Sequence, residues 1–216
     1  LLAVRKNLEA VDMKTLEEAR DKVLWGRERK SAGYSQTDRE TTAWHEAGHA
    51  LLQVLLPDCD PLHKVTIIPR GRALGATMSL PEKDVLNRTR KHFLAEIRIC
   101  CGGRIAEEIF TGDISTGAAQ DIRQATEIAR EMICRYGMSE RFGLMGLATI
   151  ESQYLEGRAV LNCSDVTAAA VDEEVRKIME DCYNESKRIL SENMEAMDMI
   201  ADELIREETI SGKDFM

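Results

Sequence analysis

The sequence predicts a mainly α-helical domain that carries a small β-hairpin or short sheet. Apolar residues recur every three or four positions over most of residues 38–206, which is the period of amphipathic helices. Only two short runs, 64–69 and 73–80, are apolar and rich in β-branched residues. With 216 residues and 44% hydrophobic content, the chain can bury one substantial core.

The first 30 residues form a separate segment in this prediction. Helical patterns at 1–9 and 15–24 are followed by the charged stretch WGRERKSAGYSQ, whose glycines and polar residues are typical of a connection. We therefore expect helices in 1–30, a linker at 31–37 and the main domain at 38–216.

The main domain is expected to begin with a helix. Thr37 and Glu40 have the spacing of a capping box, in which the Thr37 hydroxyl accepts from a free backbone amide and Glu40 reaches back to the first one. Apolar residues then follow at helical spacing until Pro57: Ala43, Trp44, Ala47, Leu51, Leu52 and Leu55.

The elements after this helix begin with β structure. The two β-branched runs flank 70–72 and predict a hairpin or two short strands. A helical pattern resumes after Asn87, and we expect Gly102-Gly103 to interrupt it before a further turn or two. The last three helices are expected to follow 115–117 as far as Gly137, and to span 165–190 and 193–206.

Composition and charge exclude several classes of protein. Lys and Arg number 29 against 38 Asp and Glu, a net charge of −9, and no basic cluster contains aromatic residues, so we expect no nucleic-acid partner. The longest apolar run, 51–56, is far shorter than the ~20 residues of a membrane-spanning helix.

The six cysteines include no C-x-x-C pair and are expected to be buried and reduced. The start lacks a Met and a signal-peptide pattern, which suggests a piece of a longer protein.

The stretch HEAGH at 45–49 predicts a metal site on the first helix of the main domain. His45 and His49 lie four residues apart, so both imidazoles can face one ion. Zinc brings the pKa of a coordinated water to roughly 7, and Glu46 could take its proton. The alternative is a helix whose histidines are merely hydrogen-bonded. Gly48 argues against it, because glycine costs about 1 kcal/mol in a helix and suggests that another segment approaches closely there.

A catalytic zinc needs a third protein ligand and an open position. Residue type leaves several candidates: His63, His92, Glu107, Glu108 and Asp121. Asp121 comes early in a predicted helix, where an acidic side chain could simply stabilise the helix dipole. The residues alone therefore do not choose among these candidates.

Six motifs in one order resemble the peptidase domain of the FtsH family of membrane-anchored, ATP-dependent zinc metalloproteases. They are HEAGH, KVTIIPRGRALG, LPEKD, GGRIAEE, STGAAQDIRQATEIAR and YGMSERFG, and the similarity extends from about 38 to 211. Residues 1–30 resemble the last helices of the ATPase module that precedes this peptidase. No G-x-x-x-x-G-K-[ST] stretch is present, so this chain is not expected to hydrolyse ATP itself.

The resemblance implies a set of roles for the site residues. The family's aspartate in STGA-x-x-D matches Asp121, which becomes the third ligand of one zinc per chain beside His45 and His49. Glu107 would then be a nearby structural carboxylate that supports a ligand. Glu46 matches the general base. Polypeptide substrates are expected to bind extended along an exposed edge strand within residues 73–80.

The resemblance also implies the setting in which the domain works. It implies a homo-hexamer that degrades unfolded or damaged polypeptides, with ATP used only by the absent ATPase module. Membrane attachment would come only through the missing N-terminal region, at the bacterial inner membrane with the peptidase on the cytoplasmic side, or alternatively in a mitochondrion or chloroplast. The alternative function is a non-cleaving, zinc-stabilised hexamerisation or scaffold domain, against which the presence of Glu46 argues. Trp44 replaces a tyrosine common in the family, and no ligand is affected.

Overall fold

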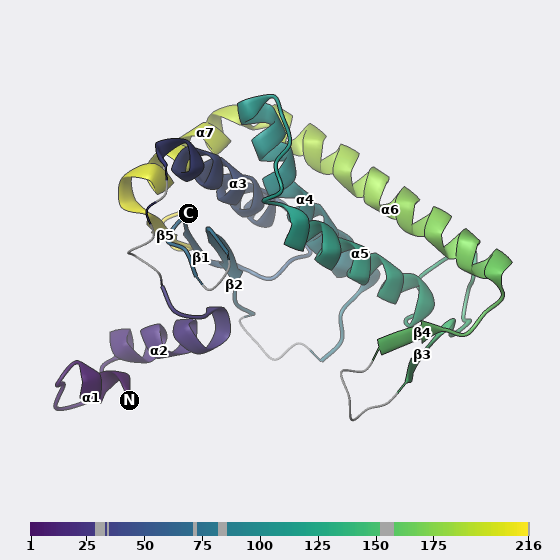
Figure 1. Cartoon of the computed structure of the whole chain (residues 1–216), viewed down its shortest axis with the longest axis horizontal. Coiled ribbons are helices and arrows are strands. Elements are labelled where there is room, and N and C mark those ends of the chain that lie inside the picture. Colours follow the sequence, from purple (N-terminus) through teal and green to yellow (C-terminus); the bar gives the residue numbers. More distant parts are fainter. Residues whose placement is uncertain (29–32, 34, 71–72, 82–85, 152–157, 216) are drawn as a thin grey trace.

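Two long helices that cross closely form the centre of the domain in the computed structural model (Figure 1). The structure describes residues 1–28, 33, 35–70, 73–81, 86–151 and 158–215. Helix α3 spans Gln36–Leu55 and helix α4 spans Arg90–Thr111. A Cβ added to Gly102 would lie 2.7 Å from the carbonyl oxygen of Gly48. The expected close approach at Gly48 is therefore present, and α4 is the segment that makes it.

Helix α3 begins two residues earlier than the Thr37 capping box predicts. Ser35 is the N-cap: its hydroxyl accepts from the Asp38 amide at 3.1 Å, while Asp38 accepts from the Ser35 amide at 3.3 Å. A capping box needs a hydroxyl and, three residues on, an acceptor, and this earlier pair satisfies that need equally well. The prediction from Thr37 and Glu40 was therefore wrong, and the helix begins within the stretch expected to be linker.

Helix α4 runs without interruption through Gly102-Gly103, so the predicted break was also wrong. A Cβ added to Gly102 would meet the α3 backbone, and one added to Gly103 would lie 2.5 Å from Nε2 of His49. The two glycines make room for α3, and the packing of the helices outweighs the low helix propensity of glycine. The helix ends at Gly112, whose φ of 70° is left-handed.

A three-stranded antiparallel sheet lies against α3. Strand β1 (Leu62–Thr66) pairs with β2 (Ala76–Ser79) and with β5 (Thr209–Ser211), in the order β2-β1-β5. The predicted hairpin is confirmed, although residues 71–72 of its turn lie outside the described residues. The third strand was not predicted, because it comes from the far end of the chain. Strand β2 occupies an edge of this sheet, where only one side of the strand is paired.

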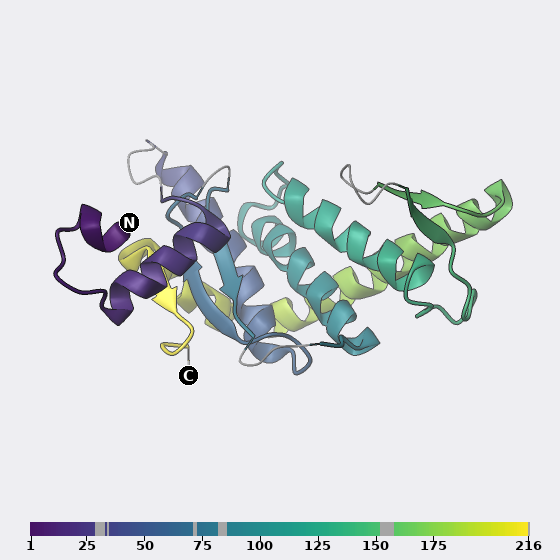
Figure 2. The same cartoon turned by 90° about the horizontal axis from the view of Figure 1, so that it is seen from below.

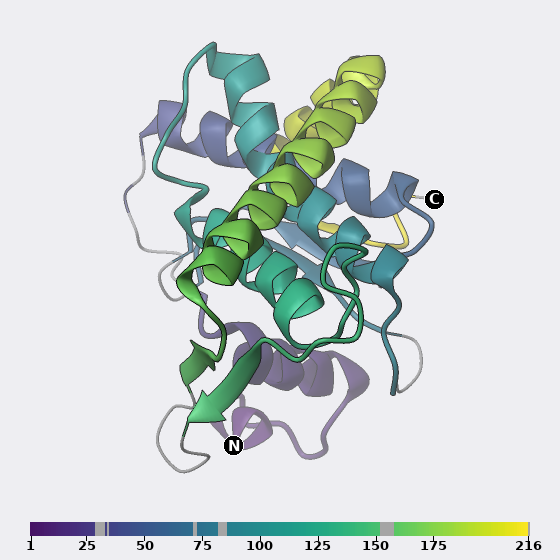
Figure 3. The same cartoon turned by 90° about the vertical axis from the view of Figure 1, so that its right-hand side faces the viewer.

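The remaining helices extend the domain away from the sheet. Helix α5 spans Ala119–Cys134, and helices α6 (Asp165–Glu192) and α7 (Met194–Glu207) follow it. Figure 3 shows α6 running diagonally across α4 and α5. Strands β3 (Ala148–Glu151) and β4 (Arg158–Leu161) form a separate hairpin that was not predicted. The mainly α-helical class with a small sheet is confirmed.

The N-terminal segment packs against the sheet through charged groups. Helix α1 spans Leu2–Arg5 and α2 spans Met13–Trp25, which lies beside the sheet in Figure 2. Asp21 of α2 is buried and accepts from Lys64 of β1 at 2.5 Å. Trp25 stacks on His63, with ring centroids 6.0 Å apart. Among the described residues, His63 belongs to neither group of side chains that could share a metal ion, so it is not the third ligand.

Buried apolar residues form two clusters that meet around α4. One joins α3 to α7 and the sheet, and the other joins α4, α5 and α6. All six cysteines are free, as expected, and four of them are buried, but Cys59 and Cys163 are only half-buried. The buried ones include Cys100 and Cys101 of α4. Burial raises the pKa of both of these thiols to about 12, so they behave as small apolar groups. Across the described part of the chain, no helix has the length and apolarity to cross a membrane.

The Gly48 contact leads to a stability prediction. Replacing Gly48 with alanine should lower the free energy of unfolding by about 1–3 kcal/mol, because the new methyl group would lie 2.7 Å from the Ala106 Cβ and separate the helices. This loss of stability should exceed the gain that alanine brings through its higher helix propensity. Urea unfolding measures it, with Gly146→Ala as control, since a Cβ at Gly146 meets nothing within 4 Å. A Gly48→Ala protein as stable as the control would contradict the close crossing.

Candidate metal centre

Helix α3 presents His45 and His49 on one face toward α5. Their Nε2 atoms lie 3.0 Å apart, and the rings meet edge to face at 74°. Residues four apart on a helix lie one turn above each other, so this pairing follows from the local sequence. His49 is 6% exposed, which places the pair inside the protein.

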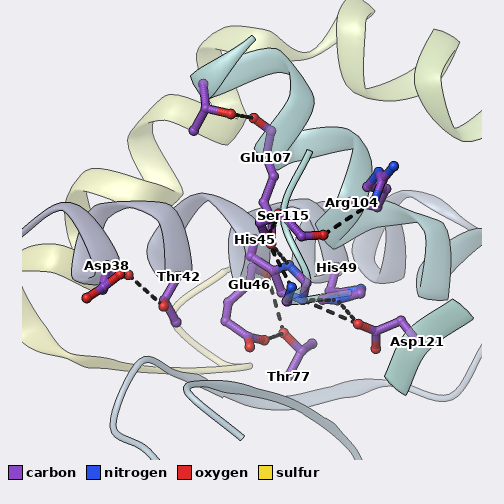
Figure 4. Close-up of polar contacts among 12 residues, drawn as sticks. Asp38, Thr42, His45, Glu46, His49, Thr77, Arg104, Glu107, Ser115 and Asp121 are labelled. Atoms are coloured by element: carbon purple, nitrogen blue, oxygen red, sulfur yellow. Dashed lines mark hydrogen bonds and ion pairs between the residues drawn. The ribbon is translucent and has the colours of Figure 1, made fainter. Parts of the chain in front are cut away.

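Asp121 reaches the same point from the first turn of α5. Its Oδ2 atom lies 3.5 Å from Nε2 of His45 and 3.8 Å from Nε2 of His49. Figure 4 shows the aspartate pointing toward both rings. Two of the other candidates lie elsewhere: Glu108 contacts Tyr183 and Lys187, and His92 belongs to a different group with Asp60 and Glu96. Glu107 lies at the site but contacts the outer nitrogen of His45 instead of the shared point.

The geometry of these three side chains fits zinc. A tetrahedral ion with nitrogen and oxygen ligands at about 2.0–2.1 Å separates neighbouring ligand atoms by about 3.3 Å. The spacings of 3.0, 3.5 and 3.8 Å among His45, His49 and Asp121 bracket this value. Two imidazoles and one carboxylate leave a fourth position for water or substrate, which is the donor set of a catalytic zinc site.

Outer hydrogen bonds fix the orientation of both rings. Nδ1 of His45 donates to Oε1 of Glu107 at 2.7 Å, and Nδ1 of His49 donates to the carbonyl of Ile99 at 2.6 Å. A proton on Nδ1 leaves the lone pair of a neutral ring on Nε2, directed at the shared point. Glu107 is itself held by the hydroxyl of Ser115. Both partners of the histidines come from α4.

The structure therefore places Glu107 behind His45, as the resemblance implies for a supporting carboxylate. Sequence reasoning missed Ser115, the Ile99 carbonyl and Gly103. The glycine leaves space for both rings, since a Cβ there would lie 2.5 Å from Nε2 of His45. A glycine pair inside an apolar helical pattern was the signal, and it was interpreted as a break.

The charges of the site favour a cation. Burial alone lowers the pKa of His45, but hydrogen bonds with Asp121 and Glu107 outweigh burial and raise that pKa to about 10. Burial alone raises the pKa of Asp121, but contacts with the two histidines hold it below its ordinary value. The site thus combines an ionised carboxylate with a protonated ring, so a metal ion that binds here displaces a proton.

Glu46 lies beside the histidines on α3 and faces the sheet. The side chain is 5% exposed, and its Oε2 atom accepts from the Thr77 hydroxyl at 2.7 Å. Figure 4 shows the carboxylate turned toward β2, on the side of the rings away from Glu107. A buried carboxylate next to a candidate zinc position is suited to move protons at that position.

Fold and site together define a helical metallopeptidase domain of the H-E-x-x-H type. The sequence model of Peptidase family M41 matches residues 32–216, and the chain therefore belongs to this family. The family assignment agrees with the resemblance to the FtsH peptidase domain.

Curated relatives agree with this assignment. The chain is 48% identical over 215 residues to ATP-dependent zinc metalloprotease FtsH 2 of Methylacidiphilum infernorum, covering 98% of this chain and 34% of that protein. It is 48% identical over 217 residues to ATP-dependent zinc metalloprotease FtsH of Myxococcus xanthus, covering 99% and 34%. The protein of that name from Photobacterium profundum is 45% identical over 217 residues, covering 98% and 31%. The chain spans about a third of the length of these relatives.

The hydrogen bond behind His45 leads to a prediction on metal affinity. Glu107→Gln removes the negative charge that makes His45 a better ligand, so zinc affinity should fall about 10- to 100-fold. Competition with a chromophoric chelator measures this change. Glu108→Gln is the matched control, because Glu108 points to Tyr183 and Lys187 instead. Equal zinc affinities for the two variants would show that Glu107 does not support the ligand.

Proposed function

We propose that this domain hydrolyses internal bonds of extended polypeptides, with His45, His49 and Asp121 holding one zinc ion and Glu46 acting as general base. The observation that carries the proposal is the convergence of three ligand atoms, all within 4.8 Å of one another, beside the buried carboxylate of Glu46. A scaffold that only bound zinc would have no need of that carboxylate. The non-cleaving alternative is therefore not favoured.

In the proposed peptide-bond hydrolysis, different residues orient the metal ligands and transfer the proton. Zinc at such a site supplies Lewis-acid polarisation of the scissile carbonyl and acidification of water. Glu46 accepts a proton from the attacking water while the oxygen of that water bonds to the carbonyl carbon. The same carboxyl group then gives that proton to the leaving amine as the carbon–nitrogen bond breaks. Glu107 and the Ile99 carbonyl keep both imidazoles in one orientation throughout.

Strand β2 is suited to hold the substrate next to these groups. It lies at the edge of its sheet and directly contacts Glu46 through Thr77. The Leu80 amide donates to the Pro61 carbonyl, on the side of β1. Because amides alternate along an antiparallel strand, those of Thr77 and Ser79 face the free edge. An extended peptide can pair with them and gain affinity without regard to most of its side chains.

The setting of the domain is a further proposal, which the resemblance to the FtsH family suggests and which the relatives' description as ATP-dependent zinc metalloproteases supports in part. We propose that residues 1–30 end an ATPase module, that the whole protein forms a homo-hexamer, and that ATP drives unfolded polypeptides to the site. Exposed apolar side chains on the N-terminal segment support a contact with another part of the protein: Val4, Val11, Met13, Leu16 and Val23. The relatives compared are bacterial, which supports a bacterial protease over a mitochondrial or chloroplast one. Its place at the inner membrane, with this domain on the cytoplasmic side, is proposed from the resemblance to the FtsH family alone.

The assigned base gives a direct test of the function. Glu46→Gln should abolish cleavage of an unfolded substrate such as casein, because an amide cannot take the proton, and about one zinc per chain should remain. Metal analysis and a gel-based degradation assay measure the two quantities. Glu40→Gln on the same helix is the control and should cleave normally. Undiminished proteolysis by the zinc-loaded Glu46→Gln protein would refute the assignment.

The proposed pairing with β2 gives a second test. Ser79→Pro removes an amide that faces the free edge and leaves the ladder to β1 intact, so kcat/KM for peptides should fall at least about tenfold. Ser79→Ala removes the hydroxyl but keeps the amide, so the difference between the two variants isolates the backbone contact. If both variants cleave peptides alike, the substrate does not pair at this position.

A further inference from the structure

The carboxylate of Glu46 is held on one side only. Its Oε2 atom accepts from the Thr77 hydroxyl at 2.7 Å, and no other side chain among the described residues donates to either oxygen. The same hydroxyl lies 3.3 Å from the backbone carbonyl of Glu46. A buried charged group with a single donor depends strongly on that donor for its orientation.

The other oxygen of Glu46 lies so close to Gly75 that a side chain there would displace it. A Cβ added to Gly75 would lie 2.6 Å from Oε1 and 2.7 Å from Cγ of Glu46. The φ angle of Gly75 is not in the left-handed region, so the position needs glycine for space and not for conformation. The two oxygens of Glu46 therefore have different surroundings: Thr77 of β2 donates to Oε2, whereas Gly75, just before that strand, packs against Oε1 without offering a side-chain donor.

The backbone amide of Thr77 also points toward the position proposed for the substrate. Alternation along β2 points its amide toward the free edge, while its side chain points toward α3. A peptide that pairs with β2 would therefore brace the residue that orients Glu46. The hydroxyl and the amide belong to one residue, so pairing and orientation are mechanically linked.

We propose that Thr77 is the positioning residue of the general base: it holds Oε2 of Glu46, makes Oε1 the oxygen that carries the proton, and ties this arrangement to substrate pairing on β2. The inference rests on the proposed function of Glu46. A proton leaves water for Oε1 as the new carbon–oxygen bond forms. It passes from Oε1 to the leaving nitrogen as the carbon–nitrogen bond breaks, and Oε2 stays bonded to Thr77 in both steps.

Kinetics of two Thr77 variants test the role of the hydroxyl. Thr77→Val keeps the β-branched shape and removes the donor, so kcat should fall about 10- to 100-fold while KM for a peptide changes less than about threefold. Thr77→Ser restores the donor and should recover most of kcat. Thr149→Val, on the distant strand β3, controls for the same exchange in a strand and should cleave as the wild type does. A Thr77→Val enzyme with unchanged kcat, or one affected only in KM, would overturn the proposal.

Crystal structures of the zinc-loaded wild type and Thr77→Val give a readout that does not depend on turnover. The Glu46 carboxylate should be ordered in the wild type and displaced or in several conformers in the variant. A Glu46 side chain in the same place in both crystals would overturn the positioning role, whatever the activity. Cleavage by Glu46→Gln would instead refute the general base, so the two failures are distinguishable.

Discussion

Helices α3 and α4 cross with their backbones in contact at Gly48 and Gly102, and the candidate metal site depends on this close approach. The approach brings the outer nitrogen of each histidine within hydrogen-bond distance of an α4 acceptor, the Glu107 carboxylate and the Ile99 carbonyl. Any side chain at the crossing would hold the helices apart and leave those nitrogens unsatisfied. The cost of glycine within a helix is thus offset by the orientation of two ligands.

Burying several ionisable groups in one place is unfavourable unless each is paired. The site meets this requirement because His45 lies between two carboxylates, Asp121 on one side and Glu107 on the other. Ser115 in turn holds Glu107, and the segment that carries Ser115 leads directly into α5 and Asp121. One loop therefore holds both Asp121, the proposed third ligand, and Glu107 behind His45, so their positions are correlated.

The small sheet contributes to the same site from the opposite side. Its edge strand supplies the hydroxyl that holds Glu46, and its free edge is where we propose that an extended peptide pairs. Strand β5, at the far end of the chain, pairs with β1 and leaves β2 as the open edge. The short C-terminal strand thus decides which edge of the sheet remains available beside Glu46.

Local pattern in the sequence was enough for the features that depend on near neighbours. The period of apolar residues predicted the helices, the β-branched runs predicted the β1–β2 hairpin, and the four-residue spacing predicted that His45 and His49 share one face. Asp121 was one of several candidates by residue type and was selected only by resemblance, because it lies 72 residues beyond His49. Tertiary structure decided the rest: the continuity of α4 through its glycines, the pairing of β5, and the contacts of Glu107 and Thr77. These depend on the packing of distant segments, and hydrophobic periodicity does not specify which surfaces meet.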